Sequence, residues 1–137
     1  MKTSEDKKKL HVLLVEDSKP VLQRIRSLIE ESVSVEIVGE TGMVKEALSI
    51  FHALKPDVII MDLFLTDGAS FPVIAEMKRA RPSCVVIVMT HFTIPECRER
   101  CNALGADYFF EKSKEFEKVP ETLAALCSAR ETVLTGC

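Results

Sequence analysis

No hydrophobic run in this sequence approaches the ~20 residues needed to cross a bilayer. Residues 1–9 are polar and charged, without the apolar core of a signal peptide. An excess of positive charge is also missing: 18 basic and 21 acidic residues give a net charge of −3, whereas a general nucleic-acid binder is expected to be basic. These absences predict a cytoplasmic protein without a direct membrane or nucleic-acid partner.

A disulfide framework is not expected either. The five cysteines are an odd number, and no secretion signal accompanies them. Cys97 and Cys101 are four residues apart and near His91, a spacing that could serve a metal ion, but no fourth ligand is evident. We prefer an interpretation in which both thiols pack on the buried face of a helix.

The length of 137 residues is enough for one domain with its own hydrophobic core. We expect a single stand-alone domain over 1–137, with a core over about 10–130. Residues 1–9 read as a mobile tail and residues 131–137 as a fraying end. A chain of this kind has no room for a separate output domain.

Short apolar runs alternate along the chain with segments of helical period. The runs, typical of strands covered on both faces, are Leu10–Val15, Val35–Val38, Val58–Met61, Val85–Met89 and Tyr108–Phe110. The segments between and after them have amphipathic stripes, over residues 21–29, 44–54, 71–77, 94–104 and 119–127. Strict alternation predicts a doubly wound α/β fold, with one parallel sheet between two layers of helices.

Residues that start and stop helices agree with this pattern. Ser18 is placed to cap the first helix, with Pro20 in its first turn. Thr93 and Glu96 have the spacing of a capping box at the start of the fourth helix, and Gly105 suits its end.

Polar residues follow the predicted strands where those strands end. The first strand runs into Glu16 and Asp17, the third into Asp62, the fourth into Thr90 and the fifth into Lys112. Because ligands of doubly wound sheets bind beyond the carboxyl ends of the strands, these residues should meet at one edge. Each alone has an ordinary explanation, such as a helix cap, a strand threonine or a solvated lysine. Their joint placement predicts a site.

The residue types at this edge indicate a particular chemistry. Three carboxylates without histidine suit a hard divalent cation, Mg²⁺ with Mn²⁺ as the alternative. Lys112 and Thr90 would complement the oxygens of a phosphoryl group. Asp62 is central and could act as the nucleophile that forms an aspartyl phosphate.

Four motifs then give the chain a family resemblance: residues 13–18 (LLVEDS), 56–63 (PDVIIMDL), 86–90 (VIVMT) and 105–113 (GADYFFEKS). Over roughly residues 9–130, the chain resembles the receiver domain of bacterial two-component response regulators, of the stand-alone type found in chemotaxis. The resemblance implies a flavodoxin-like (βα)₅ fold with strand order 2-1-3-4-5. It also implies a phosphoacceptor that phosphorylates itself in a Mg²⁺-dependent step, rather than an enzyme.

The resemblance assigns roles to the site residues. Asp62 matches the phosphoacceptor, and Glu16 and Asp17 match the acidic pair that binds Mg²⁺ together with Asp62 and the backbone carbonyl of Phe64. Lys112 matches the lysine that pairs with the phosphoryl group.

The resemblance also implies a switch and partners. Thr90 matches the switch hydroxyl and Phe109 the aromatic that changes rotamer. The phosphoryl donor would be a sensor histidine kinase or a histidine phosphotransfer protein. A downstream protein would bind the face formed by the fourth helix, fifth strand and fifth helix, and the chain would be a monomer or a weak phosphorylation-dependent dimer.

The chain departs from the family pattern at several positions. Thr66 and Ser113 replace common prolines. His91 follows the switch threonine, where a small residue is usual, and its imidazole could narrow access to Asp62 or contact the phosphoryl group. Phe64 and Phe92 occupy two positions that influence hydrolysis of the acyl phosphate within the family. Since neither phenylalanine can orient a water, we expect slow self-dephosphorylation, with His91 as a further modulating residue.

Three alternatives remain open. Residues 61–66 resemble the nucleophile motif of haloacid-dehalogenase-type phosphatases, but Phe64 replaces the second aspartate of that motif, and the acidic pair precedes it. A receiver-shaped binding module that needs no phosphate is the second alternative. The third is the receiver half of a longer DNA-binding transcription regulator.

Overall fold

The computed structural model describes residues 9–134 and their side chains through residue 130. The central sheet consists of β1 (Leu10–Val15), β2 (Val35–Thr41), β3 (Val58–Met61), β6 (Val85–Thr90) and β7 (Tyr108–Glu111). All neighbouring strands are parallel, in the order β2-β1-β3-β6-β7. This is the predicted 2-1-3-4-5 order, so the predicted fold class is confirmed.

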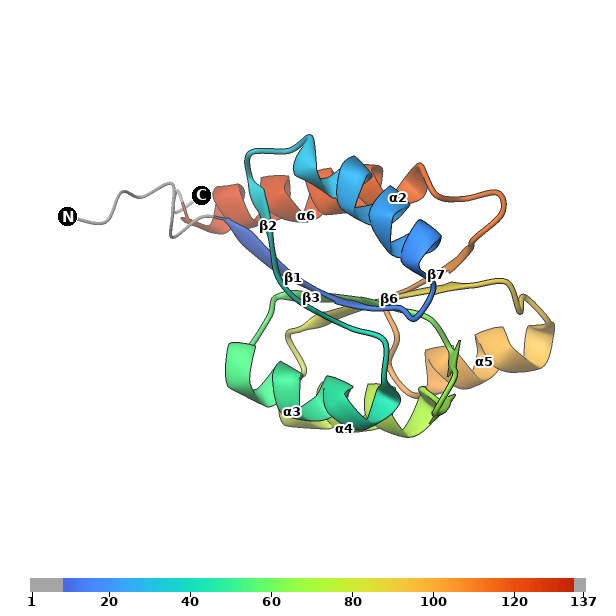
Figure 1. Cartoon of the computed structure of the whole chain (residues 1–137). Helices are drawn as coiled ribbons and strands as arrows, with labels where there is room; N and C mark the ends of the chain where they lie inside the picture. The colour runs from blue at the N-terminus through green and yellow to red at the C-terminus, as the bar shows by residue number, and fades with distance from the viewer. Residues whose placement is uncertain (1–8, 135–137) are drawn as a thin grey trace.

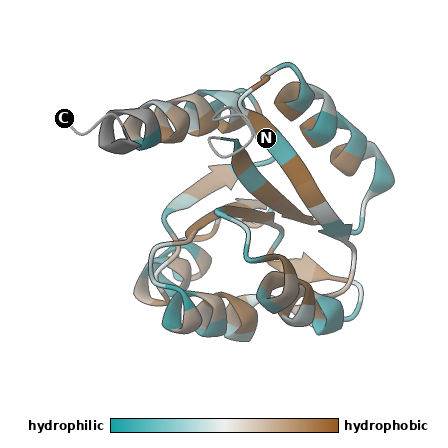
Figure 2. Cartoon of the chain, turned by 90° about the vertical axis from the view of Figure 1, so that its left-hand side faces the viewer, coloured by the Kyte–Doolittle hydropathy of each residue, from teal (hydrophilic) through white to brown (hydrophobic). Residues whose placement is uncertain are grey.

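Two layers of helices cover the sheet (Figure 1). One face carries α2 (Lys19–Glu30) and α6 (Lys118–Leu134), and the other carries α3 (Val44–Leu54), α4 (Phe71–Ala80) and α5 (Pro95–Ala103). Each interface has its own hydrophobic cluster, centred on Phe51, Ile74 and Met77 on one side and on Ile25 and Ile29 on the other. Hydrophobic and hydrophilic bands alternate along the helices in Figure 2, and α2, α3 and α4 bury apolar residues such as Ile25, Phe51 and Met77, as their stripes predicted. The stripe of α5 is weaker, since only Cys97 and Cys101 of this helix are buried.

The inner strands β1, β3 and β6 agree with the predicted runs because nearly all of their residues are buried, whereas β2, at the edge of the sheet, is mostly half-buried. β1 and β3 match the prediction, and every residue of β3 is buried. β2, β6 and β7 extend past their apolar runs to Thr41, Thr90 and Glu111. The boundaries differ because pairing continues through polar residues at the carboxyl edge.

A small hairpin was not predicted. β4 (Phe64–Leu65) and β5 (Gly68–Ala69) pair in antiparallel fashion directly after β3. Two-residue strands have no alternation long enough to be recognised in a sequence. Gly68 has a φ of 149°, which suits glycine.

The helix-start predictions are partly confirmed. The Ser18 side chain accepts a hydrogen bond from Val21 N at 3.5 Å, and Gly105, with a φ of 99°, follows the end of α5. The capping box at Thr93 is wrong, because α5 begins at Pro95 with Ile94 as an extended N-cap that makes no side-chain bond. A residue before proline is held in the extended region. Ile94, the first residue of the predicted stripe over 94–104, is 53% exposed.

The ends of the chain can be compared only in part. α6 continues as a helix past residue 131, where fraying was expected, to Leu134. The rest of the predicted tail and fraying end, residues 1–8 and 135–137, lies outside the described residues. No helix in the described part has the length and hydropathy required to cross a bilayer.

Candidate phosphoryl and cation site

Three carboxylates meet at the carboxyl edge of the sheet. β1 and β3 pair in register, with Val15 opposite Met61, so the residues that follow them come side by side. One carboxylate oxygen each from Glu16, Asp17 and Asp62 lies within 4.8 Å of the others. Parallel pairing therefore assembles the acidic cluster that the sequence predicted.

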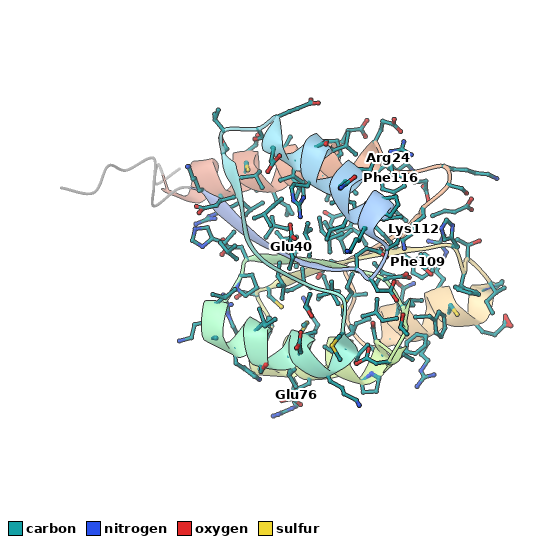
Figure 3. All side chains as sticks on the ribbon, viewed as in Figure 1. Arg24, Glu40, Glu76, Phe109, Lys112 and Phe116 are labelled. Carbon is teal, nitrogen blue, oxygen red and sulfur yellow. The ribbon has the colours of Figure 1, made fainter. Side chains whose placement is uncertain are left out.

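Lys112 joins two of these carboxylates. It follows β7 and is labelled in Figure 3. Its Nζ donates to Asp62 Oδ2 at 2.9 Å and lies 2.6 Å from Glu16 Oε1. Burial raises the pKa of Glu16. Burial alone would lower the pKa of Lys112, but its bonds to Asp62 and Glu16 raise it above the ordinary value, so the ammonium stays charged.

Hydrogen bonds restrain both the side chain and the backbone of Asp62. Its Oδ1 accepts a hydrogen bond from Leu63 N at 2.7 Å, and Lys112 binds Oδ2. Its backbone carbonyl accepts from the Ser70 hydroxyl at 2.6 Å, and Ser70 is fully buried before α4. Sequence reasoning missed Ser70, whose only signal was its place at the start of the third amphipathic segment.

Asp17 differs from its two neighbours because it is exposed. Thr66 donates two hydrogen bonds to Asp17 Oδ2: from the backbone N at 2.8 Å and from Oγ1 at 2.7 Å. The Thr66 hydroxyl is the main reason why the pKa of Asp17 is lowered. Thr66 was noted in the sequence only as a departure from proline, so its contact with Asp17 was missed.

Thr90 and Phe109, the predicted switch residues, are both buried. The Thr90 Oγ1 accepts a hydrogen bond from Phe92 N at 3.0 Å, and the Thr90 carbonyl accepts one from Lys112 N at 3.0 Å. Phe109 points into the core beside the sheet, and the guanidinium of Arg98 covers its ring at 4.4 Å. Arg98 was not predicted, since it lies on α5 and reaches Phe109 only through the packing of α5 on β7.

Phe64 and Phe92 form an aromatic pair at the rim of the site. Their rings meet edge to face with centroids 4.9 Å apart, although the side chains are 38% and 54% exposed. Phe64 also meets the edge of Phe71 at 5.8 Å. The pair connects β4 with the loop after β6, and the residue before Phe92 in that loop, His91, is exposed.

The donor set fits a hard divalent cation. Three carboxylates carry a charge of −3, and Lys112 offsets one unit of it, so the cluster retains the negative charge that Mg²⁺ or Mn²⁺ would neutralise. Within the described side chains no other group of three potential metal ligands is found. Cys97 and Cys101 are buried in the core, in agreement with the structural interpretation.

This combination defines a flavodoxin-like α/β domain with an acidic, lysine-paired site at the carboxyl edge of its sheet. The sequence model of the family described as the response regulator receiver domain matches residues 12–124. The chain therefore belongs to the receiver domain family of two-component signal transduction.

Known proteins of this family share the fold. The response regulator protein VraR of Staphylococcus aureus is 29% identical over 114 residues, which are 83% of this chain and 54% of VraR. The non-phosphorylated receiver domain of the stress response regulator RcsB from Escherichia coli is 27% identical with a TM-score of 0.79, over 88% of this chain and 95% of that one. A longer Salmonella typhimurium RcsB structure, described for its conformational dynamism for DNA interaction, is 26% identical with a TM-score of 0.80. The match covers 89% of this chain and 61% of that one. The chain thus spans about half the length of the curated relatives it matches.

Proposed function

We propose that the chain is a phosphoacceptor in which Asp62 takes a phosphoryl group from a phosphohistidine, in a step that depends on Mg²⁺. The donor would be a sensor histidine kinase or a histidine phosphotransfer protein, and the reaction would take place in the cytoplasm. The observation that carries this proposal is the double contact of Lys112 Nζ with Asp62 and Glu16 inside the acidic cluster. A buried ammonium beside a carboxylate is suited to hold the charge of an incoming phosphoryl group.

The residues divide the chemistry among them. An oxygen of Asp62 attacks the phosphorus, the phosphorus–nitrogen bond breaks, and the imidazole of the donor leaves with the electron pair. Glu16, Asp17 and Asp62 would hold the divalent cation, which supplies positive charge to the carboxylates and the phosphoryl oxygens. Lys112 and Thr90 would then bind the oxygens of the aspartyl phosphate, and the backbone carbonyl of Phe64 is a further expected ligand of the cation.

The output would be a change of the protein's own surface. Thr90 would move toward the phosphoryl group, and Phe109 would turn into the space that it leaves. This would alter the face formed by α5, β7 and α6, which a downstream protein or a second copy of the chain would bind. The resemblance implies that this ring moves in from the surface, but in the present structure Phe109 is already buried and Arg98 covers it, so the proposed turn would start from a ring inside the protein.

The acyl phosphate would be lost slowly without a partner. Hydrolysis requires a water in line with the phosphorus–oxygen bond of Asp62. Phe64 and Phe92, whose rings pair edge to face, occupy the two positions that the resemblance places beside this approach; they can donate no hydrogen bond to a water and would exclude it. We therefore expect self-dephosphorylation to be slow and the signal to last until a partner ends it.

Phosphotransfer tests the proposal directly. The purified chain is incubated with a phosphorylated histidine kinase and Mg²⁺, and the adduct is located by intact-mass and peptide mass spectrometry. Asp62→Asn should abolish the adduct, while Asp57→Asn, at the carboxylate that precedes the opposite end of β3, should leave it. An adduct on Asp62→Asn, or Asp62→Asn behaving as wild type in partner binding, would overturn the proposal. Steady turnover of a phosphate ester by wild type would favour the phosphatase alternative instead.

A second candidate is the receiver half of a DNA-binding transcription regulator. This candidate is favoured because the chain matches only 54% of the length of VraR and 61% of the longer RcsB structure, so both of those proteins have a further part. The mass of the native gene product, measured by immunoblot of its source cells, separates the two. A product near 15.3 kDa supports the stand-alone protein, and one about twice that size supports the regulator.

A further inference from the structure

We propose that Thr66 is the positioning residue of the cation site, which orients the Asp17 carboxylate for Mg²⁺. This inference rests on the function proposed above. The Thr66 backbone N–H and hydroxyl both donate to Asp17 Oδ2, at 2.8 and 2.7 Å. Because both donors converge on one oxygen, the other oxygen, Oδ1, is outside this pair of bonds.

Asp17 needs such a partner more than the other two carboxylates do. Glu16 and Asp62 are buried and share Lys112, so their orientations are fixed by an ion pair and by packing. Asp17 is exposed, and Thr66 makes both of the hydrogen bonds found between its side chain and another residue. An exposed aspartate without a fixed partner would rotate freely and would lose that freedom on binding a cation.

Thr66 can fix Asp17 because Thr66 is itself held from the opposite side. It lies between β4 and β5, which pair with each other. The next residue, Asp67, accepts hydrogen bonds from Val44 N at 2.8 Å and Lys45 N at 3.1 Å, at the first turn of α3. The hairpin is thereby attached to a helix terminus, where a carboxylate is favourable.

The main chain of Asp17 is restrained as well. A Cβ added to Gly42, in the loop before α3, would lie 3.2 Å from the Asp17 Cα. The loop thus packs closely behind Asp17 while Thr66 holds its carboxylate in front. One end of the residue is fixed by close packing and the other by hydrogen bonds.

The cation determines how much this orientation matters. Mg²⁺ demands near-octahedral geometry, whereas Ca²⁺ accepts a flexible shell of more ligands. Residues that hydrogen-bond a metal ligand typically contribute about 10–100-fold to metal affinity. Loss of the Thr66 hydroxyl should therefore weaken Mg²⁺ binding by about tenfold and Ca²⁺ binding by less.

Metal titrations of the unphosphorylated chain test this role. Mg²⁺ and Ca²⁺ affinities are measured by calorimetry for wild type, Thr66→Ser, Thr66→Val and Thr66→Pro. Serine keeps both donors, valine removes the hydroxyl, and proline removes the hydroxyl and the N–H. We expect serine to match wild type, valine to lose about tenfold for Mg²⁺, and proline to lose more. Thr93→Val, at a threonine of the opposite loop, is the matched control and should bind like wild type.

The outcomes separate this inference from the proposed function. If wild type binds no Mg²⁺, the cation site of the proposed function fails. If wild type binds Mg²⁺ and Thr66→Val binds it equally well, the cation site stands and the role of Thr66 is refuted. An equal loss for Mg²⁺ and Ca²⁺ would also refute an orienting role. Thr66 is exposed, so valine should not disturb the fold, and urea unfolding of each variant checks this.

Discussion

The Nζ of Lys112 lies 2.6 Å from Oε1 of Glu16, and each of these side chains is only 3% exposed. The same ammonium bonds Asp62 Oδ2 at 2.9 Å. One buried cation thus neutralises part of the charge of two buried carboxylates. Removing one partner of this buried ion pair should lower the free energy of unfolding, because it leaves an uncompensated buried charge.

Lys112→Met should therefore destabilise the protein strongly, by roughly 3–5 kcal/mol in the free energy of unfolding at pH 8. The deficit should shrink as the pH falls. The pKa of Glu16 is already raised by burial, and loss of Lys112 raises it further. The folded state of the variant then binds protons more tightly than the unfolded state, so acidification toward the ordinary glutamate pKa of 4.5 favours folding.

Urea unfolding of wild type and variant between pH 8 and pH 5 checks this prediction. Lys112→Met combined with Glu16→Gln should recover part of the loss at pH 8, because one unpaired charge is gone. A deficit independent of pH, or no recovery in the double variant, would show that Lys112 contributes packing rather than charge.

The acidic cluster could be predicted from sequence because it depends only on strand order and register. Glu16 and Asp62 directly follow β1 and β3, so parallel pairing brings them together whatever the loops do. The contact between Thr66 and Asp17 could not be predicted, since it depends on a hairpin of two-residue strands. Loop conformation carries no period, and hydrophobic patterns therefore do not report it.

The helix layer shows the same limit. The apolar stripe predicted α5 correctly, but the helix begins at Pro95, so Thr93 is not its N-cap as the capping box predicted. The Arg98 guanidinium lies over the Phe109 ring. This contact depends on how two segments pack together, and the pattern of neither segment alone predicts it. Sequence therefore predicts which elements form the site, whereas the residues that restrain it are found only in the structure.

Gly42→Ala should weaken Mg²⁺ binding by displacing Asp17. The added Cβ would lie 3.2 and 3.3 Å from the Cα and Cβ of Asp17, so Asp17 must shift. We expect Mg²⁺ affinity, measured by calorimetry, to fall by about tenfold, as for other residues that support metal ligands. Gly39→Ala is the control, because its Cβ would meet the Leu54 side chain at 2.8 Å instead. Equal Mg²⁺ affinities of wild type and Gly42→Ala would contradict the prediction.

Arg98→Ala should release Phe109 from its buried position. The guanidinium lies 4.4 Å from the ring centroid, and such a contact at an exposed arginine stabilises by about 0.5–1 kcal/mol. In the proposed switch Phe109 lies inward when Asp62 is phosphorylated, so loss of the contact that holds the ring inward lowers the population of this arrangement, and the variant should be phosphorylated more slowly by a small-molecule donor. Arg100→Ala removes a similar contact, with Phe71 at 4.1 Å, and should leave the phosphorylation rate unchanged. Equal rates for the two variants would argue against coupling through Arg98.

Cys101 should resist alkylation in the folded protein. Burial raises the pKa of its thiol to about 11, so at pH 8 only ~0.1% is the reactive thiolate. Labelling with iodoacetamide, located by peptide mass spectrometry, should be slow at pH 8, faster as the pH approaches 11, and fast at pH 8 in urea. Rapid labelling of the folded protein at pH 8 would contradict the buried, structural interpretation of this cysteine.

Phe64→Asn combined with Phe92→Glu should shorten the lifetime of the aspartyl phosphate. Asparagine and glutamate can hydrogen-bond a water beside Asp62, where the wild-type rings, 4.9 Å apart, offer it no partner. The rate of phosphate release from purified phosphoprotein should rise at least about tenfold, since a well-placed general base contributes roughly 10²–10⁴-fold. Phe92→Leu should remain slow because it is still apolar, and Ile94→Glu, which adds the same charge to an exposed position of the same loop, should also remain slow. If wild-type phosphoprotein decays as fast as the double variant, the aromatic pair does not protect the phosphoryl group.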